Sequence, residues 1–244
     1  YTVQPLWREG AWQTFLLRDG GREAACRSLC RGSHTLCVAI THPEQNANGL
    51  EASGMDVLRI LPWGMQSAFA KTQPGYDVET ALFNAAAVLG EKLTACRLRQ
   101  IADVVHYLDE QNGYERVVFV GQGPGALLAL LAAALLPKAR GAALLETQLS
   151  FDALFEADYY FAPETAFETG LLRLCDLPDL AKLAGRVCAF TPKNPAGGSL
   201  APHTPTPIPA RCASPAAPPR SAITGTRSAC RAAPTARACS CAKR

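Results

Sequence analysis

The residues best placed to do chemistry lie at one glycine-rich turn, Gly121-Gln122-Gly123-Pro124-Gly125. The turn follows a β-branched apolar run, Val117 to Val120, and precedes an apolar run of helix-forming residues, Ala126 to Leu136. This order predicts a strand, a sharp turn and a buried helix. Such a junction holds either a catalytic nucleophile, in the pattern G-x-S-x-G, or the pyrophosphate of a dinucleotide, in the pattern G-x-G-x-x-G/A.

The dinucleotide pattern is met by Gly121, Gly123 and Ala126. Glu146 ends the next predicted strand, where an acidic residue would hold a ribose hydroxyl of FAD or NAD. A dinucleotide domain that begins at this strand needs several further strand–helix–strand units downstream, and only one more strand is predicted there. It would also leave the strands predicted before the turn without a role.

The elements around the turn alternate between short apolar runs and helical stretches. The central runs are continuous rather than alternating, which predicts the α/β class with a mostly parallel sheet and helices on both faces. Helices are expected in two pieces over 78–110, with Gly113 as the stop signal. Strands are expected at 12–17 (an edge strand), 35–40, 56–61, 117–120, 141–145 and 186–190, with 117–120 in the sheet centre between 56–61 and 142–145.

The C-terminal part differs from the rest in composition. Residues 195–244 hold half of the 18 prolines, Lys243 and six arginines, and no Asp or Glu. Such a segment cannot bury enough apolar surface to offset an ordering entropy of roughly 1–2 kcal/mol per residue. We expect a disordered tail or a core truncated there, and an out-of-frame reading of a GC-rich gene would give the same composition. The predicted domains are an N-terminal edge segment (1–34), a core (35–194) and this tail (195–244).

The charge of the remaining chain argues against two classes of partner. Removing the seven basic residues of the tail leaves 17 basic against 21 acidic residues, so the net charge of the body is −4. Nothing in it indicates a nucleic-acid surface. The longest apolar run, Ala126–Leu136, is too short for a membrane span of roughly 20 residues. No signal-peptide pattern opens the chain, so the compartment stays open.

Three stretches resemble a known family. The sequence SFDALFEADYYFAPETAFETGLLRLCDLPDLAKLAGRV (150–187) is similar to the stretch after the glycine turn in bacterial acetyl-xylan-esterase-like hydrolases of the α/β-hydrolase superfamily. The run GEKLTACRLRQIADVVHYL (90–108) resembles that family's helix before the turn, and DVLRILPWG (56–64) resembles its preceding strand. The resemblance covers about residues 35–192. It implies an α/β-hydrolase-like core, carboxylic-ester hydrolysis without a cofactor, a small ester or carbohydrate ligand, and is compatible with a secreted or periplasmic location.

The family's chemistry does not carry over to this turn. Acyl transfer needs a nucleophile, and the serine position of G-x-S-x-G is occupied by Gly123. The next residue should donate a backbone N–H to the oxyanion, and it is Pro124, which has none. Two independent requirements therefore fail at adjacent positions, and the turn reads as a nucleophile elbow without its nucleophile.

The other expected groups are weak candidates. The acid should follow the strand at 186–190, where only Asn194 is available, and Glu146 is the substitute. The base by order would be His203, in the proline-rich tail. His42 occupies the loop where hydrolases place a second oxyanion donor, although an ordinary loop residue is the favoured interpretation. We therefore favour an inactive relative, with dinucleotide binding and a non-catalytic carbohydrate-binding or scaffold role as alternatives.

The remaining polar residues favour structural roles. Cys26, Cys30, His34 and Cys37 have a spacing that could bind a metal, but no second half of such a site follows, so no metal site is expected. His106 is expected to be a surface or partly buried structural residue. Asp176 and Asp179, in DLPDL, are expected to be turn and helix-cap residues.

Overall fold

The computed structural model describes residues 1–41, 48–65, 78–152, 155, 170–191 and 206–207. The chain divides into two units, Tyr1–Arg211 and Cys212–Arg244, and every described residue belongs to the first. The tail predicted at 195–244 lies outside the described residues except for 206–207, so its disorder stays a prediction. Within the described ranges, no helix is long and apolar enough to cross a membrane.

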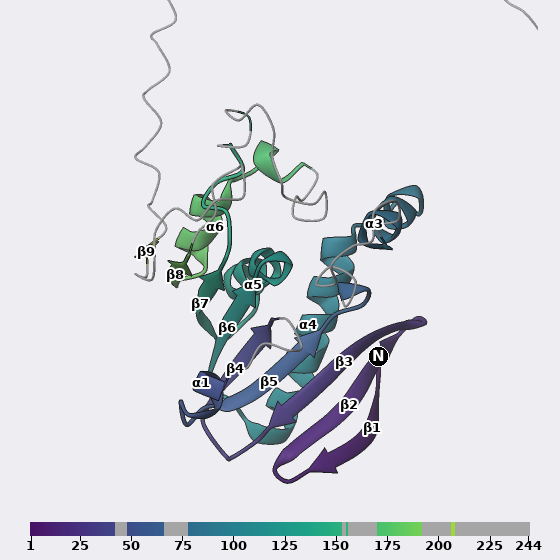
Figure 1. The fold of residues 1–244 in the computed structure, drawn as a ribbon, viewed down its shortest axis with the longest axis vertical. Helices are drawn as coiled ribbons and strands as arrows, with labels where there is room; N and C mark the ends of the chain where they lie inside the picture. Colours follow the sequence, from purple (N-terminus) through teal and green to yellow (C-terminus); the bar gives the residue numbers. More distant parts are fainter. Residues whose placement is uncertain (42–47, 66–77, 153–154, 156–169, 192–205, 208–244) are drawn as a thin grey trace, which may run out of the picture. The chain divides into compact units, whose positions relative to one another are not determined.

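A mixed β-sheet, nine-stranded over the described residues, forms the centre of the first unit (Figure 1). Its spatial order is β1-β2-β3-β5-β4-β6-β7-β8-β9. Strands β5, β4, β6, β7 and β8 run parallel, whereas β1, β2 and β3 pair antiparallel and β9 pairs antiparallel with β8. The strands are β1 Thr2–Glu9, β2 Trp12–Asp19, β3 Arg22–Leu29, β4 Thr35–Ile40, β5 Asp56–Leu61, β6 Arg116–Gln122, β7 Ala139–Leu145, β8 Arg186–Phe190 and β9 Thr206–Pro207.

The helices are α1 Asn48–Glu51, α3 Val78–Val88, α4 Leu93–Asn112, α5 Pro124–Leu135, the 3₁₀ turn η3 Leu171–Arg173 and α6 Leu177–Leu183. Helices α3, α4 and α5 lie where the sequence predicted helical stretches, whereas α1 was not predicted. Gly113 ends α4 with φ 65°, a left-handed conformation that glycine adopts without a Cβ penalty, and its N–H donates to the Asp109 carbonyl (2.8 Å). Asp176 and Asp179 form a capping box at the start of α6, as expected.

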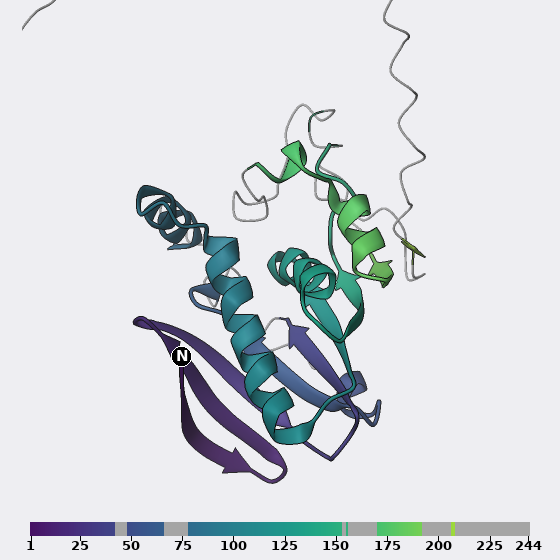
Figure 2. The same cartoon turned by 180° about the vertical axis from the view of Figure 1, so that it is seen from behind.

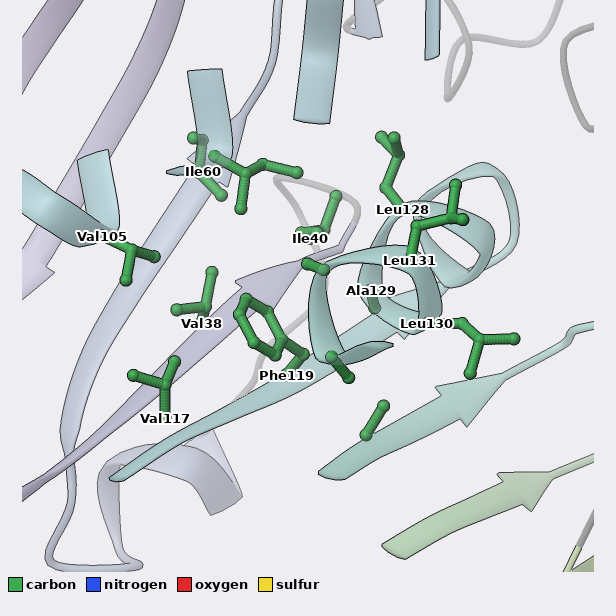
Figure 3. Close-up of a cluster of buried hydrophobic side chains, with 14 of the residues drawn as sticks. Val38, Ile40, Ile60, Val105, Val117, Phe119, Leu128, Ala129, Leu130 and Leu131 are labelled. Atoms are coloured by element: carbon green, nitrogen blue, oxygen red, sulfur yellow. The ribbon is translucent and has the colours of Figure 1, made fainter. Parts of the chain in front are cut away.

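One hydrophobic core lies between the sheet and the longer helices. Figure 2 shows α4 crossing one face of the sheet, and Figure 3 shows Leu128–Leu131 of α5 beside side chains of β4 and β6. Phe119 and Ile101 are buried at its centre. Full burial of such a side chain stabilises the fold by about 1.5–3 kcal/mol. On the opposite face, the short helix α1 reaches β5 through an ion pair between Glu51 and Arg59 (3.2 Å).

The N-terminal segment contains more strand than the sequence predicted. The expected edge strand at 12–17 is the middle strand of an antiparallel trio, because β1 and β3 flank it on either side. β1 was missed since it is exposed almost throughout and carries Pro5 at an irregularity of the ladder, a placement that edge strands tolerate. β3 was missed because, apart from Leu29 at its end, its buried positions are the small residues Ala24, Cys26 and Ser28, which give a weak apolar signal.

The central strand has one neighbour that differs from the prediction. β6 lies in the sheet centre, but between β4 and β7 rather than between 56–61 and 142–145. β5 lies on the far side of β4, where Leu29 of β3 pairs with its Val57. The prediction was wrong because it placed the parallel strands in the order of the sequence. In the structure β4 lies between β5 on one side and β6, β7 and β8 on the other.

Candidate functional site

The glycine turn lies at the carboxyl end of β6, between two parallel neighbours. Val118 of β6 pairs with Cys37 of β4 on one side and with Gly141 of β7 on the other. In open α/β sheets, ligands bind in the crevice outside the carboxyl ends of the strands. β6 is therefore not the first strand of a separate dinucleotide sheet, and the strands before the turn belong to the same sheet as the strands after it.

The base of the turn is too tight for any residue but glycine. A Cβ on Gly121 would lie 2.5 Å from the Gly125 carbonyl oxygen and 2.6 Å from the Ala129 Cβ. A Cβ on Gly125 would overlap the Ile40 carbonyl oxygen at the end of β4. These two positions are the outer glycines of the pattern G-x-S-x-G, and they let α5 pack directly against β6 and β4.

The apex of the turn is open. Gly123 has φ 48° and ψ −117°, a strained conformation that side-chain-bearing residues rarely adopt. A nucleophile on a sharp strand-to-helix turn sits in such a strained position. Apart from Gly123 itself and its two chain neighbours, no described residue has an atom within 4 Å of a Cβ placed on Gly123. The backbone at this position therefore has the shape and the free space for a nucleophilic side chain, without the side chain.

Backbone hydrogen bonds hold the apex in place. The Gly123 N–H donates to the Leu145 carbonyl of β7 (3.0 Å), and the Gly123 carbonyl accepts from the Ala126 N–H (3.0 Å). Pro124 occupies the first helical position of α5, where its missing N–H costs the helix nothing. The same missing N–H removes the donor that an oxyanion would need there.

Glu146 lies beside the turn, at the end of β7. Its Oε2 accepts from the Nε2 of Gln122 at 3.4 Å, and the Gln122 side chain is buried. The Glu146 backbone is left-handed, with φ 53°, and its N–H donates to the Phe190 carbonyl of β8 (3.1 Å). A carboxylate is thus held next to the open apex by two neighbouring strands, as either an acid of hydrolysis or a ribose-binding group would require.

A buried ion pair that sequence reasoning missed fixes the turn after β5. Arg97 of α4 donates from Nη1 and Nη2 to both carboxylate oxygens of Glu79 in α3 (2.6 and 2.8 Å), and its Nε donates to the Trp63 carbonyl (3.0 Å). The Trp63 N–H donates to Oε1 of Gln100 (2.8 Å). Trp63 is therefore held by its backbone. The signal was available: an arginine on the buried side of a predicted helix needs a partner.

Three predicted candidates cannot be placed. His42, Asn194 and His203 lie outside the described residues, so their suggested roles as oxyanion donor, acid and base stay predictions. His106 is exposed on α4 and lies 3.1 Å from Glu110. That arrangement agrees with the structural role predicted for it.

The four residues with metal-like spacing occupy different environments. Cys26 and Cys37 are buried in the sheet, where burial raises the pKa of both thiols, that of Cys37 to about 12. Cys30 is exposed, and the His34 Nδ1 lies 3.8 Å from a carboxylate oxygen of Glu115. Over the described ranges, no group of three or more metal-ligating side chains is found.

Comparison with known proteins gives similarity at the level of structure. No protein-family model matches the sequence, and no curated protein matches it. Among solved structures, a proposed acetyl xylan esterase from Bacteroides fragilis NCTC 9343 superposes with a TM-score of 0.61 at 8% identity, covering 79% of this chain and 63% of that chain. Acetyl xylan esterase 1 from Thermoanaerobacterium sp. JW/SL YS485 gives a TM-score of 0.46 at 17% identity, covering 75% and 66%.

A cold-adapted esterase from an Arctic intertidal metagenomic library gives a TM-score of 0.44 at 18% identity, covering 59% of this chain and 64% of that chain. The chain thus spans less than two thirds of the length of this esterase and of the Bacteroides protein. Of the three, the Bacteroides protein superposes best. The parallel strands, the central β6 and the strand–turn–helix junction at its end agree with that similarity. This chain has the α/β-hydrolase fold.

Proposed function

We propose that this chain is a non-catalytic relative of carboxylic-ester hydrolases. It keeps the backbone turn of the nucleophile elbow but lacks the groups that carry out acyl transfer. The observation that carries the proposal is the contrast within the turn. Gly121 and Gly125 are retained where packing requires them, and Gly123 stands where the nucleophile would be. A glycine has no atom that can attack an ester carbonyl.

The loss of the oxyanion donor supports the same conclusion independently. One oxyanion-hole donor typically contributes about 3 kcal/mol to acyl transfer, and Pro124 cannot supply it. A compensating residue would have to replace both the nucleophile and the donor. Glu146 is a titratable side chain in contact with the turn among the described residues, and a carboxylate alone replaces neither the nucleophile nor the donor.

The retained function would then be binding rather than turnover. The open space above Gly123, at the carboxyl edge of the sheet, is where this fold presents its ligands. Two of the similar structures are named acetyl xylan esterases, so a small ester or a carbohydrate is the ligand class we propose. A scaffold role on the same fold needs no ligand at all.

Dinucleotide binding is the second candidate, favoured by one contact. Glu146 lies at the end of the strand next to β6 and touches Gln122 within the glycine turn, which is the placement of a ribose-binding carboxylate. Against it, packing requires glycine at Gly125 as well as at Gly121, and the dinucleotide pattern leaves the position of Gly125 free. Titration with NAD and FAD separates the candidates, because saturable binding that is lost in Glu146→Gln supports this one.

Ester hydrolysis tests the leading proposal. The rate of p-nitrophenyl acetate hydrolysis is measured for the native chain, the same chain unfolded in urea, and Glu146→Gln. We expect the folded chain to be no faster than the unfolded one, whose exposed thiols and amines supply the background. Saturable turnover by the folded chain, above that background, overturns the proposal, and its loss in Glu146→Gln would assign the activity to this edge of the sheet.

A further inference from the structure

The face of the antiparallel strands that is turned away from α4 carries a row of aromatic and basic side chains. In Figure 1 this face of β1, β2 and β3 is turned toward the viewer, α4 lies behind the strands, and no described helix lies in front of them. Trp7 pairs with Thr14, and Thr14 pairs with Arg27. Arg27 in turn pairs with Arg59 of β5. Since paired residues point to the same face of a sheet, these side chains form one row across neighbouring strands.

Trp12, on the same face of β2, packs on both arginines. Its ring centroid lies 4.9 Å from Cζ of Arg27 and 5.6 Å from Cζ of Arg59. A guanidinium over an aromatic ring is attracted to it, whereas like charges that are directly opposite on neighbouring strands repel. Trp12 therefore holds close together two positive groups that repel each other.

The two guanidiniums use few of their hydrogen-bond donors. Within the described part of the chain, each donates from Nη2 alone, Arg27 to Glu9 (2.8 Å) and Arg59 to Glu51 (3.2 Å). The Nε of each is buried and has no acceptor among the described residues. A guanidinium has several further N–H donors, and the Nη1 groups of both residues are left for an acceptor that this part of the chain does not supply.

Other arginines of the chain have more acceptors. Arg22, whose Cζ lies 5.5 Å from the centroid of the Trp63 ring, donates from Nη1 and Nη2 to side chains at and just before the start of α4. Arg97 donates from Nε, Nη1 and Nη2. The pair formed by Arg27 and Arg59 thus lacks acceptors that comparable arginines have, and an anion from outside the chain can supply them.

The charges on this face also favour an anion. The side chain of Glu9 is 74% exposed, so water screens its attraction for Arg27. Arg31, which follows β3, donates from Nη1 to the carbonyl of Glu51 (2.6 Å) and brings a further guanidinium beside Arg59. Three guanidiniums and two carboxylates therefore lie on or beside this face, which leaves an excess of positive charge.

We propose that this face binds a small molecule that carries a carboxylate or a phosphate on a flat ring. The anionic group lies between Arg27 and Arg59 and accepts hydrogen bonds from both, for which the planar guanidinium is well suited. The ring stacks on Trp7, which is 61% exposed and is separated from Arg27 in the row by the smaller Thr14. The site does not use the glycine turn, so it is tested separately from the function proposed above.

Titration of the native chain with phenyl phosphate and with phenylacetate, followed by ¹H–¹⁵N NMR, tests the site. We expect saturable shifts of the indole N–H signals of Trp7 and Trp12, while that of Trp63 stays in place. The more tightly bound of the two probes identifies the anionic group. The neutral analogue 2-phenylacetamide should bind about tenfold more weakly than phenylacetate, since it lacks the charge. Absence of saturable shifts at Trp7 and Trp12, or equal binding of the neutral analogue, overturns the proposal.

Two variants and a matched control locate the interaction, which is followed at the indole of Trp12. Arg27→Gln should weaken binding of phenyl phosphate about tenfold. Trp7→Ser should weaken it about fivefold and leave binding of inorganic phosphate unchanged, because only the ring contact is lost. Arg18→Gln removes an arginine of the same face that is likewise paired with an exposed carboxylate, that of Glu23 (2.7 Å), and should not change the affinity. Equal losses in Arg18→Gln and Arg27→Gln would show unspecific attraction by charge and overturn the proposal.

Discussion

The base and the apex of the glycine turn are two residues apart, yet they are constrained in opposite ways. At the base, Gly121 and Gly125 meet backbone and side-chain atoms so closely that a methyl group has no room. At the apex, a side chain on Gly123 would enter open space within the described structure. Packing therefore restricts the residue type at the base of this turn and leaves the residue type at its apex unrestricted by neighbouring atoms. Under the proposed function, the apex can lack a nucleophile while the fold is kept.

The largest expected effect comes from the base of the turn. Gly125→Ala places a methyl group on the Ile40 carbonyl, which is backbone and cannot rotate away. We expect a loss of about 3 kcal/mol or more in the free energy of unfolding, measured by urea denaturation. The matched control is Gly49→Ala in α1, where no described atom lies within 4 Å of the new Cβ and the backbone φ is not positive. A loss of less than 1 kcal/mol in Gly125→Ala would contradict the tight base.

A smaller effect is expected at the apex. Gly123→Ala meets no steric overlap but forces a Cβ onto a backbone with φ 48°, so we expect about 1–2 kcal/mol of destabilisation. Gly20→Ala in the β2–β3 turn has a similar φ of 54° and similar free space, and it measures the cost of a Cβ at a positive φ. Because Gly123 combines its positive φ with a ψ of −117°, its loss should be at least that of Gly20→Ala, and both should be smaller than that of Gly125→Ala. If Gly123→Ala lowered the free energy of unfolding as much as Gly125→Ala, the base and the apex of the turn would not differ in how tightly they are packed.

Strain beside the apex gives a still smaller effect of opposite sign. The Glu146 backbone is left-handed, with φ 53°, which is strained for any residue with a side chain. The hydrogen bond that its side chain accepts from Gln122 is long, at 3.4 Å. Glu146→Gly should therefore stabilise the chain by up to about 1 kcal/mol in the same urea experiment. Destabilisation by this change would show that the contact with Gln122 matters more than the strain.

Thiol reactivity tests the core beneath the turn without changing stability. Only the thiolate is nucleophilic, and burial raises the pKa of Cys37 to about 12, so at pH 8 this thiol stays protonated and is shielded. Cys188 of β8 is exposed. Peptide mapping after brief treatment with iodoacetamide should find Cys188 alkylated and Cys37 unmodified. Equal alkylation of both cysteines in the folded chain would contradict the burial of Cys37 in β4.

The sequence allowed the elements around the turn to be predicted better than their neighbours. The strands at 35–40, 56–61 and 186–190 match β4, β5 and β8, because continuous β-branched and apolar runs are unambiguous when they are bounded by turns. β1 and β3 gave no such signal, since β1 is exposed and β3 buries mostly small residues. The spatial order of β4 and β5 depends on long-range pairing, which local patterns do not encode.

The features of the candidate site also fall into those that the sequence predicts and those that only the structure shows. The missing nucleophile and the missing N–H donor could be read directly from Gly123 and Pro124, because they are properties of residue types. The open apex, the contact between Gln122 and Glu146 and the buried pair of Arg97 with Glu79 required coordinates, because they join segments that are far apart in the sequence.

The most direct test of the account is to put a nucleophile back at the apex. In Gly123→Cys the new thiol would stand in open space at the N-terminus of α5, where the helix dipole lowers a thiol pKa. After exposure to p-nitrophenyl acetate, peptide mapping should find one acetyl group at position 123, formed faster than at the matched position of Gly20→Cys, and none at this turn in the native chain. Acetylation that is no faster at position 123 than at position 20 would contradict the claim that this turn is a nucleophile elbow without its nucleophile and its oxyanion donor.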